Sequence, residues 1–180
     1  MANFTNSFKS GHRLEVDVRA TLERYSRYVY TNVDVPTLHT EKGYTEIDIL
    51  AWVGNVFLVV ESKNVAAITG DIKENTAIFN SFSGSQYHSL SPLTQNRIHQ
   101  FSLSDRYSKR YGVWPNILPC VVVPSNCVVK GTIAEDPSII HFQDLASEVD
   151  ALAKVKPQDR EAGIKLAVLI EEWKGMKLRG

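Results

Sequence analysis

The chain has 180 residues, of which 43% are hydrophobic and 22% are charged, a composition typical of a soluble globular protein with one buried core. Its 20 Lys and Arg residues balance 20 Asp and Glu residues, so it lacks the basic surplus of a strong non-specific DNA-binding protein. The longest apolar run, residues 56–60, is too short to cross a bilayer, and the N-terminus has no signal-peptide core. We therefore expect one cytoplasmic domain over residues 1–180 with no membrane partner.

Cys120 and Cys127 match no disulfide or zinc pattern, and we expect them to be reduced.

The first predicted element is a helix over residues 11–30. Its apolar residues recur every three or four positions, as a helix packed on one face requires; they are Leu14, Val18, Leu22, Tyr25 and Val29. Because each residue advances about 100° around a helix, Glu15 falls at the edge of this stripe rather than opposite it. Glu15 is an ordinary surface glutamate unless the helix packs over the strands that follow.

A short strand at residues 32–35 and a β-hairpin at residues 45–63 are predicted next. The first strand of the hairpin alternates apolar and polar residues, and the second is a continuous β-branched and aromatic run. Gly54-Asn55 between them is a two-residue hairpin signal. With that loop, Leu50 lies opposite Val59, whereas a three-residue loop would shift the register.

Charged residues meet at the open end of this hairpin. The same register places Asp48 opposite Glu61 on one face of the sheet, and Lys63 follows two residues farther along that face. Two facing carboxylates are unfavourable unless a cation lies between them, so the pattern indicates a hard-cation site beside an ammonium group. The alternative is an ordinary cross-strand ion pair between Glu46 and Lys63 at a solvated end of the sheet.

The second half of the chain is expected to be mainly helical around one buried strand. The elements predicted are a small hairpin of residues 67–69 and 77–79, a helix at 92–110, a buried strand at 117–123, a short strand at 138–142, and helices at 142–155 and 158–174. Ser91 is expected to cap the helix that Pro92 begins, and Pro119 indicates a bulge or an unpaired position in the buried strand. Apolar residues expected to point into the core include Trp52, Trp114, Ile164, Val168 and Trp173.

Together these elements follow the order αβββαβ. This order predicts an α/β (α+β) fold in which a mixed central sheet is flanked by helices. The core of the fold is expected over about residues 11–123, and two extra C-terminal helices are expected to form an extension over about residues 142–175.

Four short motifs occur in order along these elements. They are Gly11 to Glu15 (Gly-x-x-x-Glu), Ile47-Asp48, the run from Asn55 to Asn64 that contains Glu61-Ser62-Lys63, and Pro92 followed by Gln95. This ordered set resembles the nuclease-related domain (NERD) branch of the PD-(D/E)XK nuclease superfamily over roughly residues 11–123. The chain departs from the family pattern at Ile47, where the superfamily name has proline, at Ser91, where asparagine is usual, and in the offset position of Gly54. None of these departures removes a reactive group.

The resemblance implies a restriction-endonuclease-like core and a metal-dependent nuclease that acts on nucleic acid, most directly DNA. It implies that Asp48, Glu61 and the backbone carbonyl of Ser62 bind Mg²⁺ or Mn²⁺. It also implies that Lys63 orients the attacking water or steadies the phosphate.

Two residues on the predicted helices complete the implied site. Glu15 would reach a second metal or a metal-bound water, and Gln95 would hydrogen-bond the water or a phosphate oxygen. His99 lies one turn beyond Gln95 and is not assigned to the site, since a lone histidine on a helix is more often a partly buried structural residue.

A non-catalytic nucleic-acid-binding or assembly module of the same fold is the alternative function. The zero net charge and the lack of a recognisable DNA-reading element favour it. The presence of Asp48, Glu61 and Lys63 together argues against it, because a decayed site usually loses one of them. A homodimer remains open at this point.

Overall fold

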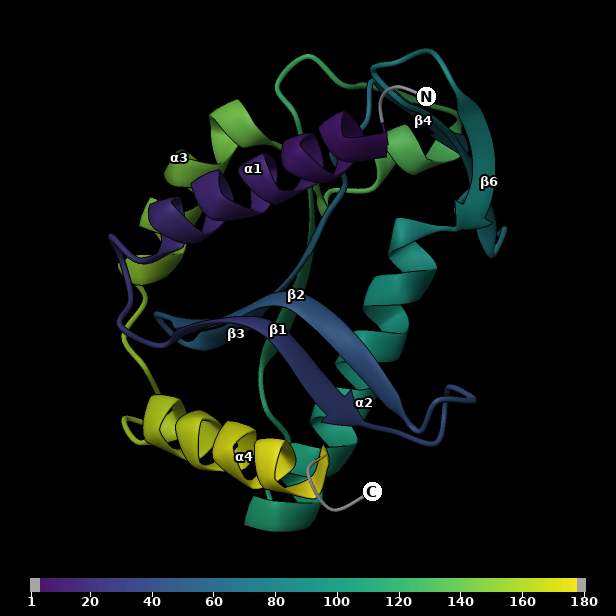
Figure 1. Ribbon diagram of the computed structural model, residues 1–180. Helices are drawn as coiled ribbons and strands as arrows, with labels where there is room; N and C mark the ends of the chain where they lie inside the picture. The colour runs from purple at the N-terminus through teal and green to yellow at the C-terminus, as the bar shows by residue number, and fades with distance from the viewer. Residues whose placement is uncertain (1–3, 178–180) are drawn as a thin grey trace.

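The computed structural model describes residues 4–177, with the side chains of residues 13–176, and has a mixed α/β fold (Figure 1). Its elements are α1 (Phe4–Leu22), β1 (Val29–Pro36), β2 (Tyr44–Val53), β3 (Val56–Ser62), β4 (Ala67–Gly70), β5 (Thr76–Asn80), β6 (Gln86–Leu90), α2 (Pro92–Tyr111), β7 (Ile117–Val123), β8 (Val128–Lys130), η1 (Thr132–Glu135), β9 (Ile139–His141), α3 (Phe142–Ala153) and α4 (Ala162–Lys177). The predicted α/β (α+β) fold class is confirmed.

The central feature is a five-stranded mixed sheet with the strand order β1-β2-β3-β7-β9. The pairs β1–β2 and β2–β3 are antiparallel, whereas the pairs β3–β7 and β7–β9 are parallel. Side chains of α1 and α3 pack on one face and side chains of α2 and α4 on the other (Figure 1). Because β3 and β7 are parallel, their carboxyl ends meet at one edge, where open α/β sheets place their ligands.

The β2–β3 hairpin has the predicted register. Val53 pairs with Val56, and Leu50 pairs with Val59. Gly54 occupies the loop with φ of 57°, a left-handed conformation that this type of turn requires and that glycine adopts at little cost. The Gly-Asn dipeptide therefore determined the turn as expected.

The open end of the hairpin departs from the predicted geometry at Asp48. Ile47 and Leu50 are three residues apart, yet both belong to the core cluster beneath α2 and α4, so the alternation of faces is interrupted between them. The position opposite Asp48 on β1 is Asn32, whose φ of 51° is left-handed. The Asp48 side chain lies with Ser62 on the α1 side of β3, so the prediction that it shares one face with Glu61 is wrong.

A second, four-stranded sheet with the order β6-β5-β4-β8 lies beside the carboxyl ends of the central strands. The predicted small hairpin forms β4 and β5, and Ile68 pairs with Phe79 in it. The strands β6 and β8 were not predicted. The backbone N–H of Ala66 donates to the carbonyl of Asn80 at 2.8 Å, so this sheet is attached to the segment that follows β3.

The first helix ends earlier than predicted. It stops at Leu22, and Tyr25 and Val29 lie outside it. Val29 instead begins β1 and pairs with Ala51 of β2, so a long-range strand pairing replaced the last turns that the apolar spacing had indicated. The helix still buries Val18 and Leu22 against the sheet.

The C-terminal helix also differs from the prediction. It begins at Ala162 rather than residue 158, because residues 159–161 form a turn in which the Asp159 carboxylate accepts the backbone N–H of Glu161 at 2.9 Å. Ile164 and Val168, which were predicted to face inward, are 54% and 42% exposed. The helix is apolar on several sides, so spacing alone selected the wrong face. Its buried residues are Ala162, Leu166, Leu169, Ile170 and Trp173.

Two further expectations about single residues are resolved. Trp114 is 77% exposed, so its predicted place in the core is wrong, whereas Trp52 packs against the core cluster beneath α2 and α4. Pro119 lies in register with Val59. The pairing of β9 covers only residues 121–123 of β7, so Pro119 sits where β7 has a strand neighbour on one side alone.

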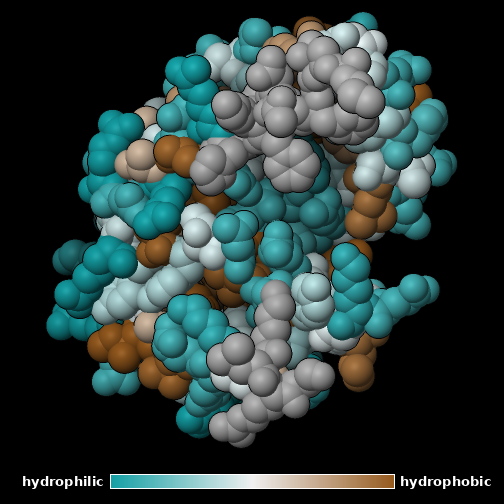
Figure 2. Space-filling view, in the orientation of Figure 1, coloured by the Kyte–Doolittle hydropathy of each residue, from teal (hydrophilic) through white to brown (hydrophobic). Residues whose placement is uncertain are grey.

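Both cysteines are buried free thiols, as predicted. Burial raises the pKa of the Cys120 thiol to about 12 and that of Cys127 to about 11, so neither is an activated nucleophile. No helix within residues 4–177 combines the length and apolar character that a membrane span requires. On the face shown in Figure 2, hydrophobic residues occur in small separate clusters among hydrophilic ones.

Candidate active site

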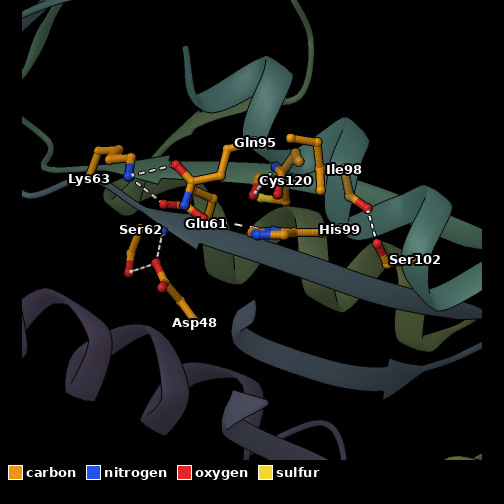
Figure 3. A network of polar contacts seen from close by, with 10 residues as sticks. Asp48, Glu61, Ser62, Lys63, Gln95, Ile98, His99, Ser102 and Cys120 are labelled. Atoms are coloured by element: carbon orange, nitrogen blue, oxygen red, sulfur yellow. Dashed lines mark hydrogen bonds and ion pairs between the residues drawn. The ribbon is translucent and has the colours of Figure 1, made fainter. Parts of the chain in front are cut away.

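The predicted residues gather where β3 ends, between α1 and the start of α2 (Figure 3). Glu61, Lys63 and Gln95 lie on the α2 side of β3, and Asp48 lies with Ser62 on the α1 side. The two groups are separated by the thickness of one strand. Polar side chains therefore flank the end of β3 on both faces of the sheet.

Glu61 is the most deeply buried charged residue of the site, with 1% of its surface exposed. One carboxylate oxygen, Oε1, forms an ion pair with the ammonium of Lys63. The other, Oε2, is buried and has no hydrogen-bond partner. Burial raises the pKa of Glu61 to about 7, and the opposing effect of Lys63 is too small to cancel it; the nearby carboxylates of Asp48 and Glu15 add to the rise in pKa. The negative charge at this position is therefore incompletely compensated.

Lys63 connects β3 to α2. Its Nζ donates to Gln95 Oε1 at 3.1 Å as well as contacting Glu61, and its side chain remains 23% exposed. These two contacts leave the ammonium held in place but accessible from solvent. The contacts of the Lys63 ammonium are Glu61 and Gln95 and not the alternative partner Glu46, which is exposed and lies opposite Asp34 of β1 in the backbone register.

Gln95 is positioned by the beginning of α2. Its backbone N–H donates to the carbonyl of Ser91 at 2.9 Å and closes the first helical turn, which Pro92 begins as predicted. The hydroxyl of Ser91 does not cap the helix: it makes no cap hydrogen bond and is buried without a partner. The first turn therefore depends on Pro92 and on backbone hydrogen bonding for its position.

Asp48 is held by the backbone of β3. Its Oδ2 accepts hydrogen bonds from the Ser62 N–H at 2.8 Å and the Ser62 hydroxyl at 3.1 Å. In a strand the N–H and C=O of one residue point to the same side, so the Ser62 carbonyl also faces the Asp48 side of β3. This arrangement brings together the carboxylate and the carbonyl that were expected to share a ligand.

Glu15 lies on α1, half-buried, and close enough for its charge to raise the pKa of Glu61. The helix therefore packs over the hairpin, which was the condition for Glu15 to be more than a surface glutamate. The structure thus brings all five predicted catalytic residues, Asp48, Glu61, Lys63, Glu15 and Gln95, to the neighbourhood of one strand end.

His99 is a residue of this site that the sequence analysis left out. It is 1% exposed, and its Nδ1 lies 3.8 Å from Glu61 Oε2, beyond hydrogen-bonding distance. Burial, together with the charge of Lys63, lowers the pKa of His99 to about 4, so the ring is neutral. The spacing of four between Gln95 and His99 was the available signal, because it places both on one face of α2.

The comparisons with known proteins identify the family of the chain. No curated protein and no solved structure matches the chain. The family model described as Nuclease-related domain (NERD) matches residues 10–124. That range is more than half of the chain, runs from α1 through β7, and contains every residue of the site described above. The chain therefore belongs to the nuclease-related domain family.

Proposed function

We propose that this protein is a metal-dependent nuclease that hydrolyses phosphodiester bonds, with DNA as its substrate. The observation that carries the proposal is the buried Glu61 carboxylate, whose Oε2 has no hydrogen-bond partner while Oε1 contacts a partly exposed lysine. A buried carboxylate oxygen without a partner is costly unless a cation binds it. Because Glu61 belongs to a nuclease-related domain, a divalent metal ion is the cation expected at its Oε2.

The oxygen donors at this strand end are of the type that Mg²⁺ and Mn²⁺ prefer. The residues that would hold the ion are Asp48 and Glu61, with the carbonyl of Ser62 and with Glu15 as a further carboxylate. Within residues 13–176, whose side chains are described, no three His, Cys, Asp or Glu side chains lie close enough together to form a metal-binding group by themselves, so waters and substrate phosphates would have to complete the shell of an ion bound here. Mg²⁺ in phosphoryl-transfer enzymes is commonly held by one or two carboxylates, with waters and substrate phosphates completing its shell. When bound, a divalent ion supplies positive charge for the phosphate and lowers the pKa of water.

Lys63 is assigned the role of a fixed positive charge beside the scissile phosphate. Its ammonium is oriented by Gln95 and Glu61, so it is already in place before the substrate binds. A preoriented charge of this kind stabilises a transition state in which negative charge increases on the phosphate oxygens. Gln95 acts through Lys63, which it contacts by Oε1, and its amide N–H₂ can donate further hydrogen bonds.

Cleavage that depends on a divalent metal is the first test of this proposal. Purified protein incubated with plasmid and oligonucleotide DNA is expected to cut in Mn²⁺ or Mg²⁺ and not in EDTA. An RNA oligonucleotide of the same sequence is included, and cutting of RNA alone would show that the assigned substrate is wrong. Binding of DNA without cleavage in either metal would favour the non-catalytic alternative.

Metal binding can be measured separately from cleavage through thermal unfolding. Near-saturating Mn²⁺ is expected to raise the Tm of the wild type by about 5 °C, because a ligand that binds only the folded state stabilises it. Glu61→Gln should lose this shift, since the amide cannot supply the negative charge that the ion requires. Glu46→Gln, an exposed position on the same hairpin, is the matched control and should keep it. Equal shifts in both variants would contradict the assignment of Glu61 as a metal ligand.

A further inference from the structure

A cavity lies near the candidate active site at the carboxyl ends of β3 and β7. It has a volume of about 380 Å³, within the range of small-molecule sites. Its apolar lining includes Leu14 of α1, Pro124 after β7 and Phe142 of α3. Asn64, the residue directly after Lys63, also lines it. The cavity therefore lies at the same strand end as Lys63, on the α1 side of β3, where Asp48 and Ser62 also lie.

Phe82 forms the aromatic wall of this cavity and is 51% exposed. It occupies the turn between β5 and β6, which is held in shape by hydroxyl contacts of Ser81 with Ser83 at 2.8 Å and with Ser85 at 2.6 Å. The hydrogen bond from Ala66 to Asn80 attaches the start of this turn to the segment after Lys63. The ring is therefore presented beside the site on an ordered turn, and half of its surface is available for contact.

The polar groups of the cavity suit an uncharged ligand. Arg13 and Asp17 line it from α1 and balance each other in charge. Asn64 contributes an amide that can both donate and accept hydrogen bonds. A planar nucleobase has an apolar face and a polar edge. It is bound by an aromatic ring and apolar side chains on its face and by an amide on its edge, in a cavity with no net charge.

We infer that Phe82 and Asn64 form a subsite that stacks and hydrogen-bonds an unpaired nucleobase of the strand whose phosphate lies at Lys63. In a duplex the faces of each base are covered by its neighbours, so a base can reach Phe82 only from a single strand or after leaving the stack. The preferred substrate of this protein is therefore single-stranded DNA. This inference rests on the proposed function for the position of the phosphate.

The test measures binding in EDTA, where metal-dependent cleavage cannot occur. The probes are a fluorescently labelled DNA single strand and the duplex of the same sequence, followed by fluorescence anisotropy. Phe82→Ala is expected to weaken binding of the single strand by about 5-fold or more, as the loss of one base–aromatic stack does, and to leave duplex binding unchanged. Phe82→Trp, which keeps the stacking surface, should bind the single strand at least as tightly as the wild type.

Phe101→Ala is the matched control, because Phe101 is a phenylalanine of α2 that is 64% exposed and does not line the cavity. It should change single-strand affinity by less than about twofold. Equal effects of Phe82→Ala and Phe101→Ala would overturn the inference, as would an equal loss for single strand and duplex. Cleavage of single strand and duplex at equal rates in wild type and Phe82→Ala would support the nuclease and overturn the subsite. Phe82-dependent binding in a protein that never cuts would support the subsite and contradict the nuclease.

Discussion

Replacing Lys63 with alanine is expected to lower the rate of DNA cleavage by about 100- to 1,000-fold, the effect usually seen when one preoriented stabilising group is removed from an active site. The structure explains why a large effect is expected: the Lys63 ammonium is fixed between Glu61 and Gln95 before substrate binds. Lys63→Arg should not restore activity, because a planar guanidinium cannot replace a compact ammonium in a space shaped by those two contacts. Single-turnover cleavage in Mn²⁺ with excess enzyme measures the effect.

Lys109→Ala is the control for this experiment. Lys109 is an exposed lysine of α2, and its ion pair with Asp105 lies on the protein surface, where such pairs contribute little. Its removal should leave the rate within about twofold of the wild type. A Lys63→Ala protein that stays folded and cuts as fast as Lys109→Ala would show that any nuclease activity arises elsewhere, in another site or in a contaminant.

Replacing Gly54 with alanine is expected to destabilise the protein by about 3 kcal/mol or more, the range of overpacked buried sites. Two effects act together at this position. The φ of 57° is unfavourable for any residue with a Cβ, and the Cβ itself would overlap the carbonyl oxygen of Leu152 in α3. Because this obstacle is backbone rather than a flexible side chain, either the hairpin loop or the end of α3 must move. Chemical denaturation of the folded protein measures the loss of stability.

Gly43→Ala separates the two effects. Gly43 also has a positive φ, of 75°, but nothing lies within 4 Å of the position that its Cβ would take. It should lose only the cost of the left-handed conformation, about 1 kcal/mol. If Gly54→Ala and Gly43→Ala lowered the free energy of unfolding equally, the close packing of the β2–β3 loop against α3 would not contribute to the effect of Gly54→Ala.

The local parts of the fold could be predicted because their signals lie within a few residues. Gly54-Asn55 determined the hairpin and its register, and Pro92 determined the start of α2. The end of the first helix could not be predicted in the same way. Val29 continues the apolar spacing of a helix, but its pairing with Ala51 places it in a strand, and that pairing joins positions far apart in the sequence.

The sequence predicted which residues lie at the candidate site, but it did not predict how their side chains are arranged. Asp48, Glu61, Lys63 and Gln95 lie near one strand end, but Asp48 is on the side opposite the other three. The sequence could not show that the alternation of faces in β2 is interrupted beside Asp48 or that Asp48 accepts hydrogen bonds from Ser62, since both depend on the surrounding sheet. His99 was passed over because its significance comes from Glu61, which lies on another element.

The edge of β7 has a consequence for how copies of this chain can associate. The backbone groups of Val121 point toward β9, since its N–H donates to the carbonyl of Ser138 at 2.8 Å, and the groups of Pro119, two residues earlier, point to the same edge. Proline has no N–H to donate, so the stretch that β9 leaves uncovered cannot offer a complete row of hydrogen-bonding groups. Natural sheets use proline at such places to prevent edge-to-edge aggregation. Two copies of this chain are therefore not expected to join their central sheets at β7.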